Sequence, residues 1–98
     1  MSVVIVGGNE CMVRRYKDLC SKYHCDAKVI VKMNAGLRDL GQTDLLVLFT
    51  NTVSHKMVSC ALNGVKGQNT SIARCHSSSM SALKNILDEH VGMENANV

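Results

Sequence analysis

Two short runs of uninterrupted apolar residues constrain the fold of this chain more than any other feature. The runs are VVIV at residues 3–6 and LLVLF at residues 45–49. A strand with one face in water alternates apolar and polar residues, whereas a strand covered on both faces reads as a continuous apolar run. Both runs are therefore expected to be buried strands of a parallel sheet, which needs helices on both of its faces.

Amphipathic segments separate and follow these runs. Between residues 10 and 23, after a candidate N-cap at Asn9, apolar side chains recur at the spacing of one helix face. A second helix is expected after Thr52 or Ser54, with Gly64 and Gly67 ending it, and a third after the serines at 77–79. Their expected buried faces are Met57, Val58, Ala61, Leu62 and Val65 in the second helix and Met80, Leu83, Ile86, Leu87 and Val91 in the third. Weaker apolar runs at 27–33 and 70–74 predict two further strands, and residues 34–42 suit a short helical turn or a loop.

Strands that alternate with helices imply a parallel sheet with right-handed crossovers. The simplest arrangement is a three-layer α/β domain of the flavodoxin or Rossmann-like type, with four parallel strands in the order 2-1-3-4. We expect one such domain over residues 1–91 and a flexible C-terminal tail over residues 92–98. With 98 residues, the chain has no room for a second domain.

Composition excludes several classes of function. No apolar stretch approaches the length of a membrane span, and because the first residues read as a strand, no secretory signal is expected. The net charge of +3 is dispersed and only 3% of residues are aromatic, which argues against nucleic-acid binding. An odd count of five cysteines, with no C-x-x-C, argues against a disulfide framework and favours the reducing cytoplasm.

The topology predicts where a ligand would bind. In open parallel sheets, ligands bind beyond the carboxyl ends of the strands, at the point where the winding reverses. Here that point lies between the first and third strands, and the loops after the first, third and fourth strands are rich in small polar residues. The candidate ligand-binding residues are Gly7, Gly8, Asn9, Thr52, Ser54, His55, His76, Ser77 and Ser78.

Each of these loops also has a purely structural interpretation. Gly7 and Gly8 could admit a ligand close to the backbone, or they could form a strand-to-helix turn that needs positive φ. They do not form a G-x-G-x-x-G fingerprint, and no Walker lysine follows. The serines at 77–79 could bind an anion or simply cap the last helix.

Cysteines and histidines near the same edge leave further possibilities open. His55, His76, Cys75 and Cys11 could ligate a metal ion, although no metal-binding spacing occurs within one element. A metal or a haem is a possible cofactor that this spacing does not support. Cys11 could instead be an activated thiol at a helix start, or a small buried residue. A second cluster, Cys20, His24 and Cys25, is expected at the opposite edge, where core packing explains it more simply than a metal.

Three separated motifs, VIVGGNE, TDLLVLFTNTVSH and RCHSSSMSAL, resemble the bacterial family called domain of unknown function 2325. The resemblance extends from Val3 to about Leu87 and implies a small, cytoplasmic, Rossmann-like domain without implying a particular reaction. The shared patterns fall on Val6-Gly7-Gly8, Ser54-His55 and Arg74-Cys75-His76-Ser77, which are the loops that the topology selects. Cys11 and Cys75 depart from the commoner pattern, so a role for a thiol would be special to this chain.

Three functions remain open at this point. The leading one is a binding module, regulatory or oligomeric, for a small phosphate-bearing anion or a metal ion. The second is an enzyme that uses Cys11 as a thiol with His55 or His76 as a base. The third is an interaction protein without a ligand site, which would pair through an edge strand or an apolar helix face. A homo-oligomer is expected under the first and the third.

Overall fold

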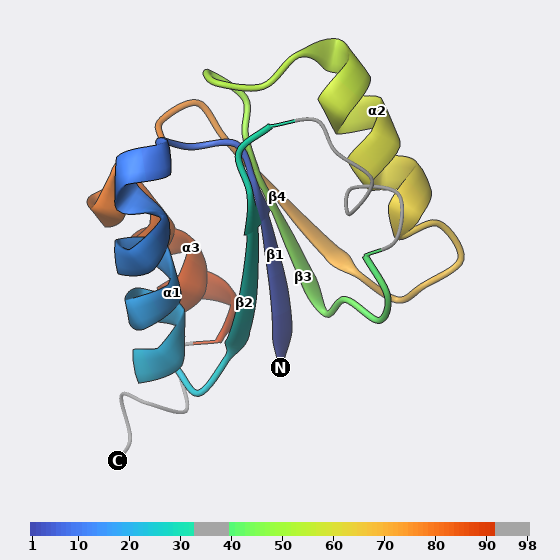
Figure 1. Ribbon diagram of the computed structural model, residues 1–98. Helices are drawn as coiled ribbons and strands as arrows, with labels where there is room; N and C mark the ends of the chain where they lie inside the picture. Colours follow the sequence, from blue (N-terminus) through green and yellow to red (C-terminus); the bar gives the residue numbers. More distant parts are fainter. Residues whose placement is uncertain (33–39, 92–98) are drawn as a thin grey trace.

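A computed structural model describes residues 1–32 and 40–91 of the chain. Its helices and strands follow one another in the order that the apolar pattern predicts (Figure 1). In chain order they are β1 (Ser2–Val6), a 3-10 turn (Glu10–Met12), α1 (Val13–Lys22), β2 (Asp26–Ile30), β3 (Leu45–Phe49), α2 (His55–Gly64), β4 (Ser71–Cys75) and α3 (Met80–His90).

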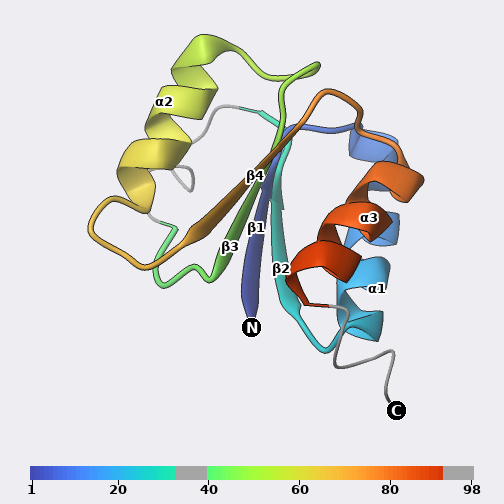
Figure 2. The same ribbon diagram turned by 180° about the vertical axis from the view of Figure 1, so that it is seen from behind.

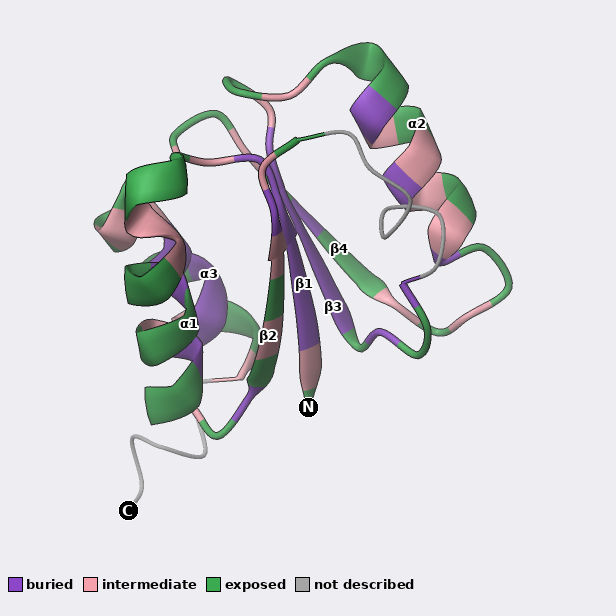
Figure 3. Ribbon diagram, in the orientation of Figure 1, coloured by how far each residue is buried: buried purple, intermediate pink, exposed green. Residues whose placement is uncertain are grey.

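The four strands form one sheet in the order β2-β1-β3-β4, and all three pairings are parallel. The predicted strand order is therefore confirmed. β1 and β3 lie side by side at the centre and are buried almost throughout, whereas β2 and β4 form the edges and are mostly exposed or half-buried (Figure 3). This difference explains why only the central strands have uninterrupted apolar sequences.

The helices divide between the two faces of the sheet, which gives the expected three layers (Figures 1 and 2). α1 and α3 cover one face, which we call the two-helix face, and α2 packs on the other, the one-helix face. Neighbouring residues of a strand point to opposite faces. Val3 and Ile5 thus join the core beneath α1 and α3, while Val4 and Val6 join the core beneath α2.

Polar side chains cap the N-termini of the helices close to the expected positions. The side chain of Asn9 accepts a hydrogen bond from the Cys11 amide, so the first helix begins with a 3-10 turn. Ser54, rather than Thr52, caps α2, and Ser79 caps α3, which therefore begins at Met80. β2 ends at Ile30, three residues before the end that the apolar run predicts.

Two predictions fall on residues that the structure does not describe. Most of the segment 34–42, expected to be a short helical turn or a loop, lies outside the described residues, and so does the whole of the expected tail at 92–98. Leu40, at the end of the first gap, is buried in the core beneath α2. None of the helices in the described part of the chain is long and apolar enough to cross a membrane.

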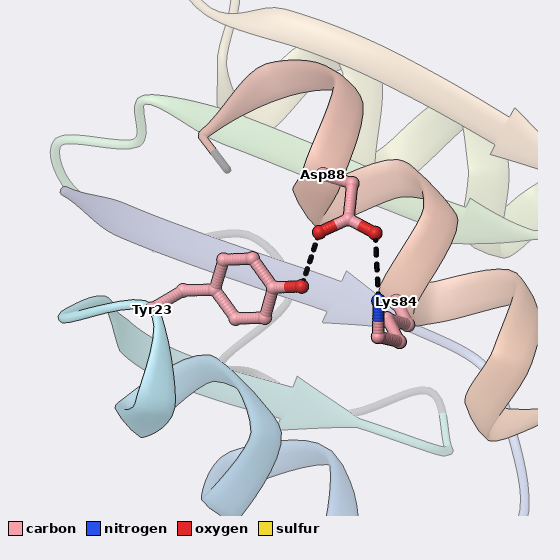
Figure 4. A network of polar contacts seen from close by, with 3 residues as sticks. All are labelled: Tyr23, Lys84 and Asp88. Atoms are coloured by element: carbon pink, nitrogen blue, oxygen red, sulfur yellow. Dashed lines mark hydrogen bonds and ion pairs between the residues drawn. The ribbon is translucent and has the colours of Figure 1, made fainter. Parts of the chain in front are cut away.

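A polar network joins α1 to α3 at the far end of the two-helix face (Figure 4). The Tyr23 hydroxyl donates a hydrogen bond to Asp88, and the Lys84 ammonium group lies 2.9 Å from the other carboxylate oxygen. Both contacts lower the pKa of the Asp88 carboxyl group, and the hydrogen bond from Tyr23 has the larger effect. The same hydrogen bond raises the pKa of the Tyr23 hydroxyl.

Candidate functional site

The three loops selected from the topology meet at the carboxyl edge of the sheet. The Gly8 amide donates to Thr52 Oγ1 at 2.7 Å, which joins the loop after β1 to the loop after β3. Thr50 joins the loop after β3 to the loop after β4. Its amide donates to the Cys75 carbonyl at 2.8 Å, and its hydroxyl lies 3.0 Å from His76 Nδ1.

The glycines of the first loop serve the turn itself. Gly7 and Gly8 have φ values of +100° and +92°, and a Cβ on Gly8 would lie 2.8 Å from the Tyr16 ring. Their amides are occupied, since Gly7 donates to the Ile30 carbonyl and Gly8 to Thr52. The structural interpretation therefore accounts for both residues, and neither amide is available to an anion in this conformation.

The serines of the last loop also make internal contacts. Ser77 Oγ accepts a hydrogen bond from the Ser79 amide, and Ser79 Oγ caps α3 through the Ala82 amide. The Ser78 carbonyl accepts a 2.6 Å hydrogen bond from the buried Tyr16 hydroxyl. This bond fixes the loop after β4 against α1.

A cleft of about 540 Å³ lies on the one-helix face, between the start of α2 and the end of β4. It is lined by Thr50, Val53, Ser54, His55, Val58 and Arg74. Of the candidate ligand-binding residues, Ser54 and His55 line this cleft. Gly7, Gly8, Asn9, Thr52, His76, Ser77 and Ser78 belong to the adjoining loops and do not line it.

Arg74 lines the cleft, and the sequence did not single it out as a site residue. It follows Ala73, whose side chain packs beneath α1 and α3, so Arg74 projects from the opposite face of β4. Within residues 1–32 and 40–91, its guanidinium group forms no salt bridge. Two features of the sequence indicate that Arg74 could belong to a site. They are its place in the family pattern and the alternation of side chains along a strand.

The electrostatics of the cleft favour an anion. The first amides of a helix lack intrahelical acceptors and carry the positive end of the helix dipole. Ser54 Oγ takes up the Met57 amide, which leaves the amides of His55 and Lys56 at the start of α2. Arg74 adds a full positive charge, and none of the described residues that line the cleft is a carboxylate.

The candidate metal ligands do not gather. Across the described residues, no group of three or more His, Cys, Asp or Glu side chains could hold a metal ion. His55 lines the cleft, whereas His76 contacts Thr50 and Cys75 packs half-buried against the other core.

The thiols differ in their surroundings. Cys11 is exposed on the 3-10 turn, so its interpretation as a small buried residue is wrong. No hydrogen bond joins its thiol to His55 or His76, both of which the structure describes. Cys20 and Cys25 are buried in the core, and burial raises the pKa of the Cys20 thiol to about 12. His24, the third member of that cluster, is exposed, with φ of +60°.

Comparison with curated proteins and with solved structures finds no match. The model of the family described as "Uncharacterized protein conserved in bacteria (DUF2325)" matches residues 2–90, which confirms the resemblance of the three motifs. This match covers nearly the whole chain, and the chain therefore belongs to that bacterial family.

Proposed function

We propose that this protein is a binding module for a small anionic ligand, held in the cleft between α2 and β4. The observation that carries the proposal is the convergence of Arg74 with the start of α2 on one cleft that no carboxylate lines among the described residues. A second hollow, of about 230 Å³ between α1 and α3, is lined by the cationic Arg15 and Lys22 but also by the carboxylate Asp18, so it suits an anion less well.

The lining suggests which chemistry the ligand presents. A phosphate or carboxylate group would bind Arg74 and the free amides of α2, in the manner common at helix N-termini. Thr50 and His55 supply further polar contacts. Val53 and Val58 form an apolar wall, so a phosphate-bearing metabolite with an apolar body fits better than an inorganic ion.

The setting that we propose is the cytoplasm. No disulfide joins any of the five cysteines, all of which the structure describes, as expected of a protein kept in a reducing compartment. The dispersed charge and scarce aromatics leave a small molecule as a better ligand than a nucleic acid.

Calorimetric titration with a panel of phosphate-bearing metabolites tests the proposal. Arg74→Gln should weaken binding by roughly tenfold or more, because a hydrogen bond to a charged group contributes about 1.5–3 kcal/mol. His55→Ala should weaken it less. Arg14→Gln, which removes an exposed arginine from α1 on the two-helix face, is the matched control and should leave binding unchanged.

Two results would contradict the proposal. One is equal binding by the wild type and Arg74→Gln. The other is that divalent metals, but none of the anions, shift the unfolding temperature of the wild type, and that His55→Ala abolishes this shift. The latter result would assign His55 to a metal site instead.

A further inference from the structure

Among the residues that the structure describes, no strand lies beside the outer edge of β4 (Figure 2). The Ser71 amide donates to the Asp44 carbonyl at 3.0 Å, and the Cys75 carbonyl accepts from the Thr50 amide. Because backbone groups alternate in direction along a strand, residues 71, 73 and 75 point theirs toward β3. The amides and carbonyls of Ile72 and Arg74 therefore point out of the sheet.

The side chain of Ile72 is exposed at the same edge. Its exposed fraction is 44%, and within the described part of the chain the only other exposed large apolar side chain is that of Met1. Ile72 lies on the one-helix face beside Arg74, because Ala73 packs on the other face. β4 thus combines outward-pointing backbone groups with an uncovered apolar side chain.

The opposite edge of the sheet differs in its side chains. β2 has two charged residues in exposed positions, Asp26 and Lys28, whereas β4 has one, Arg74. Charged residues on an edge strand discourage pairing with another chain. The two edges are therefore not equivalent, and β4 is the one suited to accept a further strand.

We propose that β4 pairs antiparallel with β4 of a second copy of this chain, about a two-fold axis beside Ala73. In this register, Ile72 exchanges both backbone hydrogen bonds with Arg74 of the second copy, and Arg74 does so with Ile72. These are the residues whose backbone groups point outward. All of β4 is then paired, since the axis passes through the middle of the strand.

Charge favours this arrangement. Centred on Ala73, the pairing sets each guanidinium group opposite an aliphatic side chain, whereas an axis at Arg74 would set like charges directly opposite each other. A two-fold contact also closes after two subunits, unlike a contact between β4 and β2, which would propagate into filaments. Pairing of one strand buries less than the roughly 1,600 Å² of a standard interface, so the dimer is expected to be weak.

The pairing would also complete the cleft. Ile72 of the second copy would stand beside Arg74 and form a wall on the open side of the anion site. This consequence rests on the proposed function, whereas the pairing of β4 does not. If no dimer forms, the proposed anion site is unaffected.

Sedimentation velocity and amide hydrogen exchange on the full chain test the pairing, without added anion. Between micromolar and ~1 mM protein, we expect a monomer to convert to a dimer by mass action. The amides of Ile72 and Arg74 should become protected roughly tenfold or more as the dimer forms. The amide of Ala73 points to β3 and should be protected at every concentration, which makes it an internal control.

Two substitutions separate pairing from folding. Ile72→Lys should weaken the dimer by roughly tenfold or more, since lysine protects strand edges. Ser59→Lys, which adds the same charge on the exposed side of α2, should not weaken it. Ile72→Pro removes an amide that the monomer does not use, so the variant should fold and remain monomeric.

Three results would overturn the proposal. The first is a wild type that stays monomeric at ~1 mM, the concentration at which even a weak interface is populated. The second is a dimer in which the amides of Ile72 and Arg74 exchange as fast as in the monomer. The third is the formation of open-ended assemblies.

Discussion

The two faces of the sheet are built from the same strands and differ in what they leave exposed. On the two-helix face, α1 and α3 enclose a core that includes Tyr16 and Phe49, whose ring centroids are 5.5 Å apart. On the one-helix face, α2 packs near β1, and Ile72 and Arg74 of β4 remain exposed. A closed face stabilises the domain, whereas an incompletely covered face can bind something else.

Substitutions in the closed core should have the largest effect. Phe49 is fully buried, and Phe49→Ala is expected to lower the free energy of unfolding by about 3–5 kcal/mol, through lost burial and the cavity left behind. Val58→Ala, at a partly buried position of the cleft, should cost much less. Urea unfolding of both variants measures the difference, and equal losses would show that the two faces contribute alike.

A substitution in the turn between β1 and the first helix should have the next largest effect on stability. Gly8→Ala adds a Cβ both at φ +92° and against the Tyr16 ring, and backbone strain of this kind costs about 1–3 kcal/mol. Gly67→Ala is the control, because Gly67 has φ +84° but nothing within 4 Å of its Cβ position. Thermal unfolding should show a larger loss for Gly8→Ala. Equal losses would mean that the Tyr16 contact adds nothing to the strain of positive φ.

The smallest effect is expected from the network between α1 and α3. The pKa of Asp88 is lowered from 3.8 in the folded state, chiefly by the Tyr23 hydroxyl. Its contribution to stability is therefore present above pH 3.8 and is lost as the pH falls through the folded pKa. The wild type should lose stability more steeply than Tyr23→Phe over this acid range. Parallel curves for the two proteins would contradict a role for this hydrogen bond.

Periodicity and handedness explain how far the fold could be predicted from the sequence. The continuous apolar runs predict central strands, the helix-spaced residues predict buried faces such as Leu83 and Leu87, and right-handed crossovers restrict the strand order. These features depend on local sequence and general rules. They also predict the polar loops at the carboxyl edge of the sheet, where the structure has them.

The candidate site could be predicted only in part, because its details depend on packing. The cleft exists where α2 leaves the face of β4 open, which no local pattern reveals. The place of Arg74 in the family pattern therefore did not by itself indicate that it lines a cleft. The amides of Gly7 and Gly8 look available in sequence, but tertiary contacts to Ile30 and Thr52 occupy them. Cys11 lies on a 3-10 turn before α1, outside the buried face that the helical spacing predicts.

A ¹H–¹⁵N NMR titration of the full chain with a phosphate-bearing metabolite tests the central claim most directly. We expect saturable shifts at the amides of His55 and Lys56, at the start of α2, and at the amide of Arg74 on β4, with little change on α1 and α3. Shifts confined to the hollow between α1 and α3, or to Gly8, Asn9 and Ser78, would contradict the account.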